Sequence, residues 1–109
     1  MRRAVALLAL MCSPAEAQED NTVAGRARDA STGSPVRFAT VTVLRDGMPV
    51  GGELADEQGR FVIEGLERGS YIVSVGFAGY TAVEAPLLIG ERNEHYDLGD
   101  LTLVRAPGV

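Results

Sequence analysis

From residue 22 onward, apolar side chains recur at every second position, and turn-forming residues interrupt them about every 8–12 residues. Successive side chains of a strand point to opposite faces, so this period is typical of half-buried strands. The pattern is clearest in Ser70–Phe77, where Tyr71, Val73, Val75 and Phe77 share one face. No eleven-residue window in this part combines a helical period with a starting cap. The pattern therefore predicts an all-β chain with almost no helix.

The turn positions divide the chain into seven predicted strands. The turns are Ser31–Pro35, Arg45–Gly47 (a hairpin signal because Asp-Gly suits positive φ) and Asp56–Gly59, followed by breaks at Gly65–Gly69 and Gly79. The predicted strands are Thr22–Asp29, Arg37–Leu44, Gly51–Ala55, Arg60–Glu64, Ser70–Phe77, Tyr80–Ile89 with a kink at Pro86, and Tyr96–Val104. Seven short strands in about 80 residues fit a Greek-key β-sandwich of two sheets.

The inward faces of these strands supply one modest core. Each large side chain contributes about 1.5–3 kcal/mol on burial, which can offset the entropy of ordering the chain. For Tyr71 and Tyr80 we expect core packing with a hydrogen-bonded hydroxyl rather than ligand stacking. The predicted inward set is Val23, Ala39, Val41, Val43, Phe61, Ile63, Tyr71, Val73, Val75, Leu101 and Leu103.

The N-terminus has the three parts of a secretory signal peptide. Met1–Arg3 is cationic, Ala4–Met11 is an apolar run too short to span a membrane, and Ala15-Glu16-Ala17 is a small-x-small site. We expect cleavage between Ala17 and Gln18. Cys12 follows Met11 rather than a small residue, so it is interpreted as removed with the signal and not as a lipid-attachment site. The predicted organisation is a signal peptide at 1–17, a polar linker at 18–21, the sandwich at 22–104 and a tail at 105–109.

Composition argues against several functions. A net charge of −5 in 109 residues disfavours nucleic acid as a partner, because nucleic acids require a basic footprint. One His and one Cys make the usual zinc sites improbable, and His95 lies in a charged segment that we expect to be a solvated loop. Asp56–Glu57 and Glu91 with Glu94 could offer oxygens to Ca²⁺, but neither matches a calcium loop. The sequence therefore predicts no catalytic, cofactor-binding or metal-binding residues.

Five segments carry a family resemblance through their order in the chain: Val23–Val36, Phe38–Val43, Ala55–Ile63, Gly65–Tyr80 and Leu98–Leu103. This ordered set resembles the carboxypeptidase regulatory-like domain, a transthyretin-like (prealbumin-like) sandwich. One departure is Arg37-Phe38, because the family commonly has a small turn-forming pair before the Ala.

The resemblance implies a non-catalytic module, similar to the domain that follows the signal peptide in TonB-dependent outer-membrane receptors. We expect an exported accessory or interaction module, in the periplasm, at the outer membrane or outside the cell, as a receptor fragment or a stand-alone copy. A protein partner in the cell envelope is expected, bound through an edge strand or loop tips. The alternatives are a structural spacer without ligand, a secreted carbohydrate- or peptide-binding module and, less favoured, a transthyretin-like hydrolase.

Overall fold

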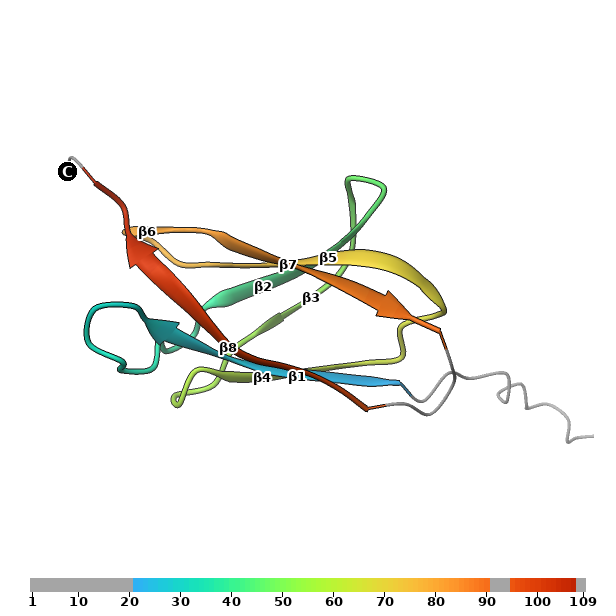
Figure 1. The fold of residues 1–109 in the computed structure, drawn as a ribbon, viewed down its shortest axis with the longest axis horizontal. Coiled ribbons are helices and arrows are strands. Elements are labelled where there is room, and N and C mark those ends of the chain that lie inside the picture. The colour runs from blue at the N-terminus through green and yellow to red at the C-terminus, as the bar shows by residue number, and fades with distance from the viewer. Residues whose placement is uncertain (1–20, 91–94, 108–109) are drawn as a thin grey trace, which may run out of the picture.

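The computed structural model describes residues 21–90 and 95–107, which fold into eight strands and no helix (Figure 1). The two layers of ribbon in Figure 1 are two sheets facing each other, as the alternating burial of β4 and β5 requires. The strands are β1 (Thr22–Asp29), β2 (Thr40–Arg45), β3 (Met48–Leu54), β4 (Arg60–Glu64), β5 (Gly69–Gly76), β6 (Tyr80–Thr81), β7 (Val83–Ile89) and β8 (His95–Arg105).

Each sheet has four strands. One has the order β4-β1-β8-β6 and the other has the order β3-β2-β5-β7. Among the described strands, β1 and β8 pair in parallel and the other neighbours are antiparallel. The all-β sandwich predicted from the sequence is confirmed, with eight strands in place of seven. Strands β3 and β7 end the second sheet, so both leave one edge unpaired.

The hairpin between β2 and β3 follows from its two central residues. Asp46 and Gly47 both have positive φ, 53° and 78°, which matches the twist of a two-residue hairpin. Arg45 therefore pairs directly with Met48. This pairing starts β3 at Met48, three residues before the predicted start at Gly51.

A bulge and a glycine shape the centre of the first sheet. Ala24 pairs with Asp97, but Arg26 pairs with Asp100, so β8 has two residues opposite Gly25. On its other side Gly25 pairs with Phe61 of β4. A Cβ at Gly25 would lie 2.5 Å from Phe61 Cζ. The ring of Phe61 therefore occupies the space that a side chain at residue 25 would need.

The core lies between the sheets and includes the predicted inward residues. Ten of those eleven are buried, whereas Leu101 is half-buried and packs against the core edge. Burial of Val36, Ala55, Leu66, Leu87 and Ile89 was not predicted, because these residues lie in turns or in a strand whose bounds were misplaced. Both tyrosine predictions are confirmed: Tyr71 is buried and its hydroxyl donates to Glu67 O at 2.7 Å, and Tyr80 packs against the core.

Two predicted strands were wrong at their bounds. Tyr80–Ile89 is not one strand kinked at Pro86: it breaks at Ala82, β6 joins β8, and β7 joins β5. The segment predicted as Arg37–Leu44 becomes a strand only at Thr40, because Phe38 has a φ of 60° that no strand contains. Phe77 follows β5 and is 42% exposed, so it does not share the buried face of Tyr71 as predicted.

The predicted signal peptide, the Ala17–Gln18 cleavage site and Glu91 with Glu94 lie outside the described residues. Within 21–90 and 95–107, no helix is long and apolar enough to cross a membrane.

Candidate functional site

One end of the sandwich is organised around the buried carboxylate of Asp29, the last residue of β1. Its Oδ1 accepts from the backbone N–H and the hydroxyl of Ser31, both at 2.8 Å, and from Thr32 N at 3.1 Å. Its Oδ2 accepts from the Tyr80 hydroxyl at 2.5 Å and lies 3.3 Å from Nη2 of Arg105. Asp29 therefore joins the ends of β1 and β8 to β6 and to the loop after β1.

The hydrogen bonds to Asp29 shift the pKa values of Asp29 and Tyr80 in opposite directions. The Tyr80 hydroxyl, followed by the Ser31 groups, holds the pKa of Asp29 well below its ordinary value. The same hydrogen bond raises the pKa of Tyr80, because the proton is shared with a carboxylate. At neutral pH Asp29 is thus an anion, and its two oxygens accept hydrogen bonds that anchor this end of the chain.

Beside this anchor lies an open hollow of about 320 Å³, which we name the aromatic cleft. The half-buried Tyr80 forms one wall, and Phe38 and Phe77 are 45% and 42% exposed. The ring centroids of Phe77 and Tyr80 lie 6.5 Å apart with the planes tilted by 51°. The cleft is lined by Pro35, Val36, Arg37, Phe38, Phe77 and Tyr80.

Phe38 reaches this position in a strained backbone conformation. Its φ of 60° lies in the left-handed region, which is unusual for a bulky side chain. Phe38 N donates to Asp56 O at 3.3 Å, which ties the loop before β2 to the turn after β3. A phenylalanine at this point accepts strain and exposes an aromatic ring.

The cation at the rim of the cleft is Arg37. Its Cζ lies 5.5 Å from the centroid of the Phe38 ring, a cation–π distance. In the described part of the chain, no carboxylate lies within ion-pair distance of this guanidinium. Arg105, by contrast, lies over the Tyr80 ring at 5.4 Å and is paired with Asp29.

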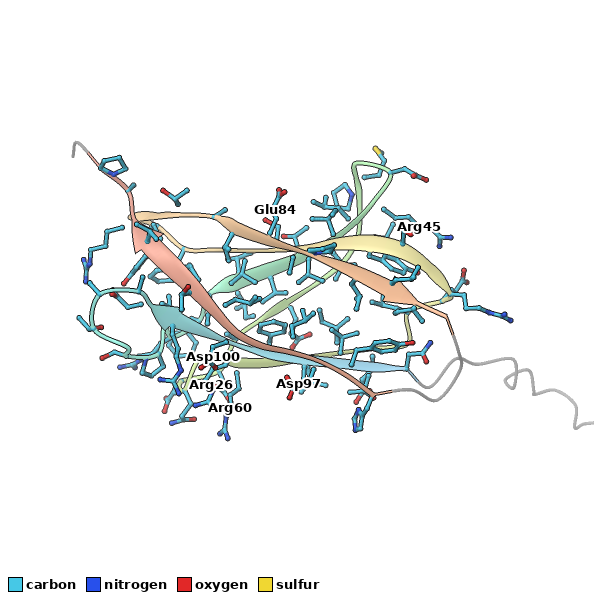
Figure 2. The ribbon with its side chains drawn as sticks, viewed as in Figure 1. Arg26, Arg45, Arg60, Glu84, Asp97 and Asp100 are labelled. Carbon is cyan, nitrogen blue, oxygen red and sulfur yellow. The ribbon has the colours of Figure 1, made fainter. Side chains whose placement is uncertain are left out.

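A second hollow, of about 430 Å³, lies on the outer face of the β4-β1-β8 layer. Figure 2 shows Arg26, Arg60, Asp97 and Asp100 projecting from this face, away from the other sheet. Asp100 pairs with Nε of Arg26 at 3.6 Å and of Arg28 at 3.2 Å. Arg60 pairs with Asp56 at 3.5 Å. Asp97, which also lines the hollow, accepts through its Oδ1 from Gly99 N at 2.9 Å. The charged side chains here are therefore mostly held by one another or by the backbone.

One of the two outer strands of the second sheet is β3. Its apolar side chains are exposed, with Met48 at 65%, Val50 at 50% and Leu54 at 61%. Ala55 N donates to Ala39 O at 2.9 Å, and antiparallel pairs alternate in hydrogen bonding. The N–H and C=O groups of Leu54 and Gly52 therefore point away from β2, toward the open edge.

The remaining predicted candidates do not converge. His95 is exposed and begins β8, so it is not in a loop. The Asp56 carboxylate accepts from Gln58 N and Arg60 N, both at 2.9 Å, and these bonds lower its pKa, that of Arg60 first. Asp56 thus closes a turn, and no group of three metal-ligating side chains occurs among the described residues. The cleft was not predicted, although Arg37-Phe38 stood out as a departure from the family pattern.

The fold defines the class of protein as a transthyretin-like β-sandwich. The model of the carboxypeptidase regulatory-like domain matches residues 22–104, and the chain belongs to this family. No curated protein sequence matches the chain.

Solved structures share the fold at low identity. The 5-hydroxyisourate hydrolase of Klebsiella pneumoniae has 24% identity and a TM-score of 0.59, over 82% of this chain and 92% of the hydrolase. The pilus 2b backbone protein of group B streptococcus has 13% identity and a TM-score of 0.62, over 81% and 42% of the two chains. The Bacillus anthracis TIE protein has 18% identity and a TM-score of 0.66, over 81% and 18%. The chain spans less than half of the last two proteins.

Proposed function

We propose that this chain is an exported, non-catalytic accessory module that binds a protein partner of the cell envelope through the free edge of β3. The observation that carries the proposal is the run of outward N–H and C=O groups at Gly52 and Leu54, flanked by exposed apolar side chains. An unpaired edge of this kind accepts an extended segment as an additional strand, and the exposed side chains supply selectivity.

The other edges are less suited to strand addition. Strand β7 carries Pro86, which has no N–H to offer. Strand β4 has five residues and begins and ends with the exposed charges Arg60 and Glu64. On β3 itself, Pro49 and a register shift beside Val50 interrupt the first half, so Gly51–Leu54 is the segment open to pairing.

The features of the N-terminus support export. A cationic start, an apolar run and the Ala15–Ala17 site precede the domain, which is the order that the resemblance to the N-terminal domain of TonB-dependent receptors implies. The protein would then act in the periplasm, at the outer membrane or outside the cell. Mass determination of the exported protein tests this part: it should begin at Gln18.

The test of edge pairing is Leu54→Pro, with Leu54→Ala as the matched control. The proline removes one outward N–H but no bond to β2, because Leu54 forms a non-hydrogen-bonded pair with Thr40. Leu54→Ala removes the same side chain and keeps the N–H. Envelope extract is passed over the immobilised wild-type protein, and the captured partner is then titrated against each purified variant.

We expect Leu54→Pro to weaken binding at least about tenfold more than Leu54→Ala, a difference of about 1.4 kcal/mol. Circular dichroism checks that both variants keep the wild-type fold. Equal affinities of the two variants would reject strand addition at this edge. Failure to capture any partner would favour the alternative role of a spacer between other domains.

A further inference from the structure

The aromatic cleft combines two features that packing alone does not require. Phe38 is held at a φ of 60° although its ring is nearly half exposed, so the strain does not serve core burial. Phe77 is similarly exposed on the facing loop. Strain that persists at an exposed position is typical of functional sites, where the surrounding structure maintains it.

The cleft also has a definite electrostatic character. Arg37 lies over the Phe38 ring and has no carboxylate partner in the described part of the chain. The nearby carboxylates already accept hydrogen bonds from other groups. Asp29 accepts from Ser31, Thr32 and Tyr80, and Asp56 accepts from Gln58 N within its own turn. Among the described residues at this end of a chain with a net charge of −5, Arg37 is an unpaired cation beside an apolar hollow.

We propose that the aromatic cleft binds an acidic peptide segment, with an aromatic side chain of the peptide seated between Phe38 and Phe77 and a neighbouring carboxylate paired with Arg37. The hollow of about 320 Å³ is at the lower end of ligand-pocket sizes, which suits one or two side chains. A guanidinium binds a carboxylate through two parallel hydrogen bonds, which orients the segment.

Other ligand classes fit the cleft less well. A sugar needs side-chain acceptors for its hydroxyl groups, and the oxygens of Asp29 and Tyr80 already form hydrogen bonds with each other and with their neighbours. A nucleic acid or an anionic membrane requires several cations, and the net charge of the chain opposes both. A single carboxylate beside an apolar group matches a single free guanidinium.

The cleft is distinct from the free edge of β3. It is built from the loop before β2 and the loop after β5, next to the last residues of β8. The inference therefore does not rest on strand addition, and the Leu54→Pro variant should bind the peptide as the wild type does. This comparison separates failure of one proposal from failure of the other.

The test uses the ¹⁵N-labelled protein and the probe N-acetyl-Glu-Phe-Glu-amide, followed by amide chemical shifts. N-acetyl-Lys-Phe-Lys-amide and N-acetyl-Glu-Ala-Glu-amide are the matched probes for charge and ring. We expect saturable shifts around Phe38, Phe77 and Gly79, and affinity about tenfold lower for each control probe. Such a loss is what removal of one contact of about 1.4 kcal/mol produces.

Two variants make the test specific. Arg37→Glu should reverse the preference, so that the Lys-containing probe binds about tenfold more tightly than the Glu-containing one. Arg68→Glu makes the same change of charge at the opposite end of the sandwich and should leave the preference unchanged. Phe38→Gly relieves the positive φ and should keep the fold while losing the probe.

Several results would overturn the proposal. They are an absence of localised shifts with the Glu-Phe-Glu probe at millimolar concentration, equal effects of Arg37→Glu and Arg68→Glu, or unchanged binding by Phe38→Gly. Shifts of the same amides by maltose but not by the peptide would instead identify a sugar site, and would equally refute an acidic peptide as the occupant.

Discussion

The backbone conformation of Phe38 predicts that Gly is more stable than Ala at this position, which reverses the usual order. At most positions outside the left-handed region, Ala is more stable than Gly, by about 0.5–1 kcal/mol within a strand or helix. At a φ of 60° an L-residue loses about 1–2 kcal/mol that Gly does not lose. Gly, however, has more conformational entropy to lose on folding than Ala, and this reduces the advantage of Gly by about 0.4–1 kcal/mol. Phe38→Gly should therefore be more stable than Phe38→Ala by about 1 kcal/mol.

The two variants lack the same ring, so their difference isolates the backbone. For a domain of this size, about 1 kcal/mol corresponds to about 4–8 °C in Tm. Equilibrium unfolding in urea gives the free energies, and thermal unfolding gives the midpoints. Phe77 provides the matched control, because it lines the same cleft, has similar exposure and does not have positive φ.

At Phe77 the order should be the ordinary one, with the Ala variant at least as stable as the Gly variant. The reasoning is refuted if Phe38→Ala equals or exceeds Phe38→Gly in stability. It is also refuted if Gly is favoured equally at both positions, because the preference would then not arise from φ.

Three further outcomes are expected. Gly25→Ala should destabilise the domain by about 1–3 kcal/mol in urea unfolding, because the new Cβ would lie 2.5 Å from Phe61 Cζ. In a Phe61→Leu background the destabilisation by Gly25→Ala should be smaller, and additive effects of the two substitutions would contradict this packing. Because the folded-state pKa of Asp29 lies below the unfolded value of about 3.9, its contribution to stability is intact above about pH 4 and is lost as the pH falls below it. Asp29→Asn should lower stability at pH 7 and flatten the acid limb of urea midpoints measured from pH 7 to 2.5, and an unchanged acid limb would argue against this role. The purified protein should not accelerate 5-hydroxyisourate hydrolysis above the uncatalysed rate, whereas turnover abolished by His95→Ala would reopen the hydrolase alternative.

Features that depend on neighbours in sequence were predictable. The alternation of Val41 and Val43 reports a half-buried strand whichever strand lies beside it. The Asp46-Gly47 turn was predictable for the same reason, because its positive φ values arise from the local chemistry of these two residues. Assigning Tyr71 to the core likewise needed only the apolar period of its own strand.

Features that depend on residues far apart in the sequence could not be predicted from it. Nothing local distinguishes Tyr80–Thr81 from Val83–Ile89, and the two segments separate because their partners, β8 and β5, belong to different sheets. The alternation that continues from Val75 predicted that Phe77 shares the face of Tyr71, but β5 ends at Gly76 and Phe77 lies in the loop that follows. The φ of 60° at Phe38 was not predicted either, and its backbone N–H donates to Asp56 O in the turn that follows the neighbouring strand β3.

The sequence alone determined the fold class of this protein, because hydrophobic period and turn chemistry are properties of a few adjacent residues. The family resemblance could also be inferred from the order of the sequence segments. Only the tertiary structure decided that residues 35–38 and 77–80 form one hollow, and that Tyr80 bonds to Asp29, which lies 51 positions earlier. The physical reason is that strand order and sheet edges result from the packing of the whole chain, and these set which side chains remain exposed for a partner.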